Sequence, residues 1–237
     1  MDSLINIFNL ILYQPLFNAL VLLYEYVPGS DFGVAVILLT AFIRLVLYPS
    51  MVKSIKTQKI MSEIQPKIQE IRKKFKDDKE KQSAETMALY RQAKINPFGG
   101  CLPLLLQLPI LFALYRVFWT GFDPEQLSRL YSFVPRPEAI NPSFLGVIDL
   151  SSPFWGFAIL AAAAQFFQGW HQNKYGGGQG MGGMMQKQML YFFPIFTVFI
   201  LWRLPSAIGL YWLVSSLFSI FQQHLIFKPN RYGQVKP

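Results

Sequence analysis

The sequence has little charge and almost none of the residues that build metal or disulfide sites. Charged side chains make up 15% of the 237 residues, against about 25% in an ordinary soluble domain. The single cysteine, Cys101, excludes an intramolecular disulfide, and two histidines cannot complete a zinc site. No glycine begins a G-x-x-x-x-G-K-[ST] motif, which excludes a P-loop. We therefore expect a protein that is not an enzyme and that has no metal and no cofactor.

Apolar residues are abundant instead. They make up 52% of the chain, and aromatic residues make up 16%, which excludes a globally disordered chain. A helix needs about 20 mostly apolar residues to cross a bilayer. Five runs meet this need, at 31–51, 97–119, 154–170, 184–203 and 206–227. The sequence thus predicts an all-α polytopic membrane protein with five transmembrane helices.

The basic residues predict the orientation of these helices. The segment from Lys53 to Lys94 holds twelve basic and six acidic residues, a net +6, whereas no Lys or Arg precedes Arg44. Because basic flanks stay in the cytoplasm, we expect an N-out, C-in topology. It comprises an outer loop at 120–153, a cytoplasmic Gly/Met loop at 171–183 and a basic cytoplasmic tail at 228–237.

The N-terminal residues 1–30 allow two interpretations. The stretch from Leu4 to Tyr26 is apolar enough to suggest a sixth span, but polar residues and a proline interrupt it at Asn6, Asn9, Gln14, Pro15 and Asn18. We predict an amphipathic helix on the outer surface. A span would require an N-in start or an inverted topology.

Residues 52–96 predict a cytoplasmic antiparallel helical hairpin. Apolar residues recur in it mostly every three or four positions, which places them on one face of a helix. They are Ile55, Ile60, Ile64, Ile68, Ile71 and Phe75. Asp77 and Asp78 indicate the turn, and Asn96-Pro97 ends the second helix. Pro66 is expected to bend the first helix.

The basic face of this hairpin has two possible roles. It could be a solvated connector whose charges only fix the topology. It could also dock partners, because basic side chains are attracted to anionic lipids and to ribosomal RNA phosphates. The docking residues we expect are Lys53, Lys67, Arg72, Lys73 and Lys74.

Arg44 is the most informative polar residue in the apolar runs. It lies nine residues before Lys53, which is about 14 Å along a helix and places it near the bilayer core. A central arginine is costly unless it faces a protein interior or a water-filled cavity. Apart from Asp31 at the start of the first run, the five runs contain no Asp or Glu to pair with it.

Other polar residues could line the same cavity. They are Thr40, Gln107, Gln165, Gln168, Ser215, Ser216, Ser219, Gln222 and Gln223. Gln165 and Gln168 are three residues apart and share a helix face. Each residue alone could equally form only structural hydrogen bonds between helices. Together with Arg44 they favour a hydrophilic groove.

Four segments resemble the YidC/Oxa/Alb family of membrane protein insertases. They are GVAVILLTAFIRLVLYPS at 33–50, IQPKIQEIRKKFKDDKEK at 64–81, INPFGGCLPLLLQLPILFALYRVF at 95–118 and GLYWLVSSLFSIFQQHLI at 209–226. The NPFGGCLP-type signature is the most specific of these. The resemblance implies a multi-pass protein of the bacterial inner membrane, with the thylakoid membrane as the less favoured alternative.

The resemblance also implies roles for particular residues. Arg44 and Trp212 match positions that face a substrate groove, and Gln168 or Gln165 matches a third. Ser216 departs from the asparagine that the family often has there. The groove residues we expect are Thr40, Arg44, Gln107, Gln165, Gln168, Trp212 and Ser216.

The predicted function is a membrane protein insertase and folding chaperone for small or single-span membrane proteins, working without nucleotide hydrolysis. The implied partners are nascent membrane proteins, the ribosome, the Sec translocase and anionic lipids, but not DNA. One alternative is an anion or polar-solute transporter that uses Arg44 as its anion site, although no repeat relates the two halves of the chain. A scaffold that docks partners through the hairpin would leave Arg44 unexplained.

Overall fold

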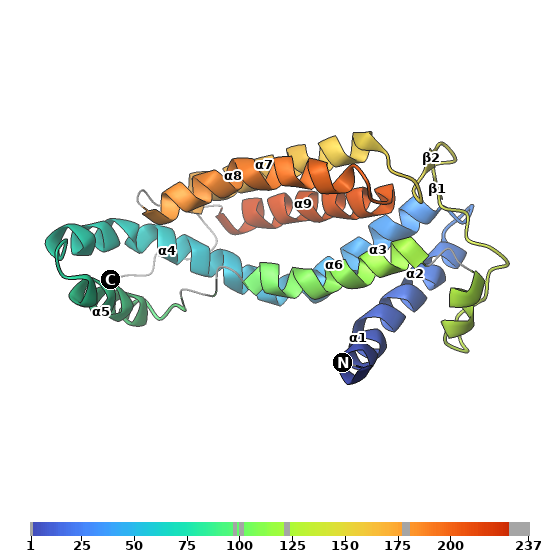
Figure 1. Ribbon diagram of the computed structural model, residues 1–237, viewed down its shortest axis with the longest axis horizontal. Helices are drawn as coiled ribbons and strands as arrows, with labels where there is room; N and C mark the ends of the chain where they lie inside the picture. Colours follow the sequence, from blue (N-terminus) through green and yellow to red (C-terminus); the bar gives the residue numbers. More distant parts are fainter. Residues whose placement is uncertain (1, 97–98, 100–101, 121–123, 177–180, 228–237) are drawn as a thin grey trace.

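The computed structural model describes residues 2–96, 99, 102–120, 124–176 and 181–227, and it is mostly helical (Figure 1). An elongated bundle carries the α4–α5 hairpin at one end and a small two-stranded sheet at the other (Figure 1). The elements are α1 (Asp2–Phe8), η1 (Asn9–Tyr13), α2 (Gln14–Tyr26), α3 (Phe32–Val46), α4 (Tyr48–Lys74), α5 (Lys79–Gln92), α6 (Leu102–Thr120), η3 (Pro124–Arg129), β1 (Ser143–Phe144), β2 (Ile148–Asp149), α7 (Trp155–Gly176), α8 (Met181–Leu201) and α9 (Ser206–Phe227).

Length and hydropathy identify few of the described helices as membrane spans when each is taken alone. Ile5–Tyr26 is long and apolar enough to cross a membrane, and α3 with α4 meets the same criteria as a bent pair. Leu105–Thr120 and Leu190–Leu201 are apolar but shorter. The count of five spans, and the surface position of the N-terminal segment, therefore stay predictions.

The polar residues that interrupt the N-terminal apolar stretch attach it to the rest of the molecule. Asn18 is buried, and its Oδ1 accepts a hydrogen bond of 2.6 Å from the Tyr131 backbone N–H. Arg116 on α6 donates to Asn9 Oδ1 at 2.6 Å and lies 4.6 Å from the centroid of the Tyr13 ring. The opposite face is apolar and more than half exposed at Ile5, Ile7, Leu10 and Ile11. The helical segment from α1 to α2 thus has one face packed on α6 and the following loop, and one apolar face uncovered.

The segment around β1 and β2 closes the sheet end of the bundle. Asp31 caps α3 by accepting from the Val34 N–H at 2.8 Å, and its second oxygen accepts from the Leu145 N–H at 2.5 Å. The first turn of α9 is capped by the same segment, because the Ser206 N–H donates to the Ser152 carbonyl at 3.1 Å. The bonds from Val34 and Ser206 satisfy N–H groups in the first turns of α3 and α9, which have no partner within their own helices.

The expected single helix at 31–51 is broken in two. α3 ends at Val46 and α4 begins at Tyr48, with a bend of 63° between them. Pro49 explains the break, because it has no N–H to donate to the carbonyl of Leu45. Residues 48–51 therefore belong to the hairpin and not to the first apolar helix.

The hairpin consists of α4 and α5, joined by a short turn. Asp78 caps α5 by accepting from the Lys81 N–H at 3.0 Å, and the two side chains form an ion pair at 3.4 Å. Pro66 lies within α4, and the helix continues through it to Lys74. Of the predicted apolar stripe, Ile55 and Ile68 are buried and the other members are partly buried.

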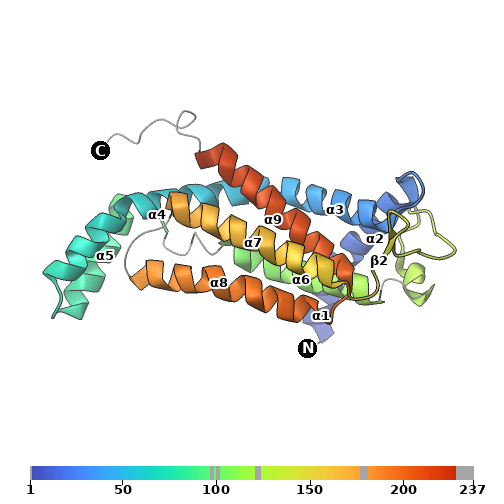
Figure 2. The ribbon, with the colours of Figure 1, turned by 90° about the horizontal axis from the view of Figure 1, so that it is seen from above.

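The last three helices pack side by side, with α7 between α8 and α9 (Figure 2). The loop expected at 171–183 is much shorter than predicted, because α7 continues to Gly176 and α8 begins at Met181. The polar residues from His171 to Lys174 were interpreted as a loop, yet none of them is a proline and they extend the helix. Residues 177–180, the tail at 228–237 and Cys101 lie outside the described residues.

Candidate functional site

A cavity of about 480 Å³ lies within the bundle, and residues of α3, α4, α6, α7, α8 and α9 line it. Its lining is mixed, with apolar residues such as Met51, Leu111 and Leu190 among many polar ones. The polar lining residues are Arg44, Gln58, Gln107, Gln165, Gln168, Gln172, Asn173, Tyr211, Ser215, Ser216, Ser219, Gln222 and Gln223. An apolar bundle with such an interior can hold a polar ligand.

The packed core ends where the cavity begins. On α3 the core extends to Ile43 and Arg44 lines the cavity; on α9 Tyr211 belongs to both. The core residues of the remaining helices lie towards the sheet, whereas the cavity residues lie towards the hairpin (Figure 1). The bundle is therefore closed by close packing at the sheet end and hollow in the half next to the hairpin.

Arg44 is buried in the last turn of α3, with 7% of its surface exposed. Its Nη2 makes a long hydrogen bond of 3.5 Å to Gln107 Oε1 on α6, and Gln107 Nε2 donates to the Tyr211 hydroxyl on α9. No carboxylate lines the cavity among the described residues. Within the described part of the chain the guanidinium has an amide and no carboxylate as its hydrogen-bond partner, so its positive charge is not neutralised there and would attract an anionic group.

Six of the seven expected groove residues line this cavity, namely Arg44, Gln107, Gln165, Gln168, Trp212 and Ser216. Thr40 is not among the residues that line it. Its side chain is fully buried, and the hydroxyl donates to the Val36 carbonyl of its own helix at 2.6 Å. Thr40 lies one turn before Arg44, on the side of the packed core, so the spacing alone could not separate core from cavity.

The two glutamines of α7 differ in their contacts. Gln165 Oε1 accepts a hydrogen bond of 2.7 Å from Thr197 Oγ1, which joins α7 to α8. Gln168 is partly buried and faces the cavity. Gln165 therefore both links α7 to α8 by a hydrogen bond and lines the cavity.

Three buried polar atoms on α9 have no hydrogen-bond partner among the described residues. They are Ser215 Oγ, Gln222 Nε2 and Gln223 Oε1, and all three residues line the cavity. A buried polar atom without a partner is destabilising, so such atoms are usually satisfied by water or by a ligand. A polar ligand would therefore form its most favourable hydrogen bonds at this part of α9.

Four polar lining residues were not among the residues expected to line a cavity, namely Gln58, Gln172, Asn173 and Tyr211. Gln58 at the base of the hairpin accepts from Gln172 Nε2 on α7, and Tyr211 bonds Gln107. Gln172 could have been found, because it lies four residues after Gln168 and shares its helix face. Gln58 could not, because its approach to α7 depends on the bend between α3 and α4.

The basic residues expected to dock partners lie along α4. Lys53, Lys67, Lys73 and Lys74 are exposed, and Arg72 is half-buried. None of them lines the cavity, but Met51, Ile55 and Gln58 at the base of α4 do. The hairpin therefore joins a basic exposed rod to one wall of the cavity.

The sequence of this chain is similar to those of known membrane proteins. Residues 22–233 match the model of a family described as 60Kd inner membrane protein. Membrane protein insertase YidC of Fusobacterium nucleatum subsp. nucleatum is 38% identical over 199 residues, which is 84% of this chain and 87% of that protein. The same-named protein of Syntrophus aciditrophicus is 36% identical over 223 residues, 92% of this chain but only 36% of that longer protein.

A solved structure is also similar. It is described as the active YidC insertase crystal structure with the first transmembrane domain resolved, and it superposes with a TM-score of 0.60 at 29% identity. The match covers 93% of this chain and 47% of that one. The helical arrangement and the sequence therefore point to the same set of relatives.

Proposed function

The chain belongs to the 60Kd inner membrane protein family, which includes the YidC membrane protein insertases, and on that basis we propose that it inserts small or single-span membrane proteins into the bacterial inner membrane. The observation that carries the proposal is Arg44, a buried cation in a polar cavity with no carboxylate in its described lining. Neither a transporter repeat nor a catalytic constellation is needed to explain that arrangement.

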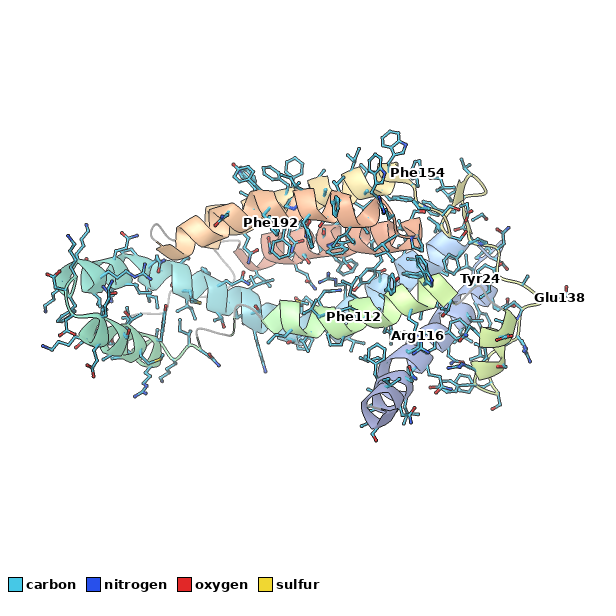
Figure 3. The ribbon with its side chains drawn as sticks, in the orientation of Figure 1. Tyr24, Phe112, Arg116, Glu138, Phe154 and Phe192 are labelled. Atoms are coloured by element: carbon cyan, nitrogen blue, oxygen red, sulfur yellow. The ribbon has the colours of Figure 1, made fainter. Side chains whose placement is uncertain are left out.

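We place the hairpin in the cytoplasm and the sheet end outside. The two ends differ in charge, since the hairpin is strongly basic whereas residues 120–153 hold four acidic and two basic residues. Glu138 lies at the end of the molecule opposite the hairpin (Figure 3). This difference supports the N-out, C-in orientation, because basic segments remain in the cytoplasm.

Five helices, α3 and α6 to α9, would then cross the bilayer. Large apolar side chains on their outer faces are more than one third exposed, as expected for contact with lipid. They include Leu38, Phe42, Leu105, Phe112, Ile159, Phe167, Phe192, Phe199 and Phe221. Phe112 and Phe192, on α6 and α8, are labelled in Figure 3.

The cavity would serve as a groove for the polar flank of a substrate. A charged side chain at the centre of a bilayer raises the free energy by about 2.5–3.5 kcal/mol on insertion scales. A polar cavity in the half next to the hairpin shortens the dry path that the flank must cross, and Arg44 attracts acidic residues within it. Burial of the substrate's apolar segment in lipid drives the reaction, so no nucleotide is hydrolysed.

The hairpin would bring partners to the mouth of the groove. Lysines and arginines close to an anionic membrane surface each contribute about 1 kcal/mol of attraction. The exposed side chains Lys53, Lys67, Lys73 and Lys74 fit this role for anionic lipids and for ribosomal RNA. The ribosome, the Sec translocase and nascent membrane proteins are the partners we propose.

Reconstitution of the purified protein alone into nucleotide-free liposomes tests the function. A synthetic single-span protein with an acidic tail is added, and the tail is assayed for protection from external protease. We expect protection well above that in empty liposomes. Protection equal to empty liposomes, with the protein shown to be folded, would reject an autonomous insertase, and anion uptake by the same liposomes would favour the transporter.

A further inference from the structure

Amide side chains dominate the polar lining of the cavity. Seven of its lining residues are glutamines, one on α4, one on α6, three on α7 and two on α9. Arg44 is the single charged residue among the described lining. The groove thus combines one fixed charge with many neutral groups that both donate and accept hydrogen bonds.

A carboxamide has the same hydrogen-bonding groups as a peptide bond, namely an N–H donor and a C=O acceptor. It can therefore bind a polypeptide main chain whatever side chains that chain carries. An extended chain offers these groups freely, whereas a helix bonds most of them internally. A wall of amides suits a site that must accept many different sequences and release them again.

Most of these glutamines already have partners. Gln107 bonds Arg44 and Tyr211, Gln165 bonds Thr197, and Gln58 bonds Gln172. The two on α9 differ. Gln222 and Gln223 are only 3% and 4% exposed. Gln222 Nε2 and Gln223 Oε1 have no hydrogen-bond partner among the described residues.

We propose that Gln222 and Gln223 bind the main chain of the substrate's polar flank, Gln222 Nε2 donating to a peptide carbonyl and Gln223 Oε1 accepting from a peptide N–H. The groove then recognises an extended polypeptide by its peptide groups, and Arg44 adds a preference for acidic side chains. This inference rests on the proposed insertase function and specifies the chemistry of its substrate. It predicts that a neutral flank without any charge still depends on the groove.

Two synthetic single-span peptides test the proposal. One carries a neutral flank rich in alanine, and the other replaces each alanine by its isomer sarcosine, which keeps every carbonyl but lacks the N–H. The rate of flank protection in proteoliposomes is divided by the rate in empty liposomes for each peptide. We expect wild-type protein to accelerate the alanine flank about tenfold more than the sarcosine flank, since loss of one hydrogen bond changes an equilibrium by up to about that factor.

The outcomes separate the two claims. Acceleration of neither peptide, nor of one with an acidic flank, would reject the proposed function itself. Equal acceleration of the alanine and sarcosine flanks would overturn main-chain recognition while leaving the insertase intact; the buried amides would then hold only water. This comparison uses only the wild-type protein, so it does not depend on the folding of any variant.

Single variants assign the two bonds. Gln223→Met should slow the alanine flank about tenfold and leave the sarcosine flank unchanged, because only the first offers the N–H that Gln223 accepts. Gln222→Met should slow both flanks, since both keep their carbonyls. Gln92→Met, on the exposed surface of α5, is the matched control and should change neither. A Gln223→Met protein that slows both flanks equally would contradict the assignment.

Discussion

Arg44 Nη2 lies 3.5 Å from Gln107 Oε1, so the buried guanidinium of α3 has the side-chain amide of α6 as its hydrogen-bond partner. Gln107 in turn donates to the Tyr211 hydroxyl of α9. An amide orients the guanidinium without neutralising it. The charge of Arg44 thus stays available to a ligand, whereas a carboxylate at the same position would remove it.

Gln107→Glu tests this relationship. The new carboxylate would pair with Arg44 and cancel its attraction for acidic flanks, so insertion of an acidic-tailed substrate should fall about tenfold, comparable with loss of one charge-assisted hydrogen bond. Protease protection in proteoliposomes is the measurement. Gln107→Met, which removes the hydrogen bond and adds no charge, is the comparison and should lose less acidic-flank insertion than the glutamate variant. Unchanged insertion by the glutamate variant would mean that Arg44 does not act on the flank.

Thr40→Val should be nearly silent in function. The Thr40 hydroxyl donates to Val36 within the packed core, so its removal leaves the cavity lining intact. We expect insertion within about twofold of wild type and a loss of stability near 1 kcal/mol, the usual net contribution of a hydrogen bond. Insertion and thermal unfolding of the same detergent-purified protein check both. A strong insertion defect in a fully stable Thr40→Val protein would restore this residue to the groove.

Gly33→Ala should loosen the sheet end of the bundle. A Cβ at Gly33 would lie 2.0 Å from Phe144 Cδ2, so either the ring or the α3 backbone must shift. Overpacking of this kind destabilises proteins by about 1–3 kcal/mol, which outweighs the gain of about 1 kcal/mol from helix propensity. Thermal unfolding measures the loss.

The double variant Gly33→Ala with Phe144→Ala provides the matching control for that clash. Removal of the ring makes room for the new methyl group, so the second substitution should be less harmful in the Gly33→Ala background than in wild type. Strict additivity of the two losses would indicate that the contact between Gly33 and Phe144 does not limit this position.

Asp149 should make the stability of the sheet end depend on pH. Hydrogen bonds from Ser151, first from its hydroxyl, and from Ser152 lower the pKa of the Asp149 carboxyl below its usual value. A carboxyl whose pKa is lower in the folded state stabilises that state above its unfolded pKa of about 3.9, and the effect disappears as the pH falls through the folded pKa. Ser151→Ala should therefore lower the unfolding temperature at neutral pH but not in strong acid. A difference from wild type that is the same at both pH values would refute this linkage.

The sequence allowed much of the cavity lining to be predicted, because Arg44 stands in an apolar run that contains no acidic residue other than Asp31 at its start. Residues three or four apart, such as Gln165 and Gln168, share a helix face, and that relation placed both in the lining. Periodicity does not tell which neighbouring face meets a packed core, and for that reason the sequence could not show that the Thr40 side chain is buried in the core. Local sequence also cannot tell which helices come together, so the contact of Gln58 with Gln172 was out of reach.

The helix boundaries illustrate the same limit. Hydropathy extended the first apolar run to residue 51, although Pro49 should have indicated that a new helix begins near it. The polar stretch from His171 onward looked like a loop, but polar residues extend a helix readily where no proline or glycine intervenes. Composition and charge thus predicted the helices themselves better than their ends.

The attraction of Arg44 for acidic flanks is tested most directly by comparing wild type, Arg44→Lys and Arg44→Ala in proteoliposomes with two substrates that differ only in an acidic or a neutral flank. We expect Arg44→Ala to reduce acidic-flank insertion about tenfold or more and neutral-flank insertion far less, and Arg44→Lys to retain much of the acidic preference because it keeps the charge. Equal insertion of both flanks by wild type, or an equal reduction of both in Arg44→Ala, would contradict a direct role for the Arg44 charge.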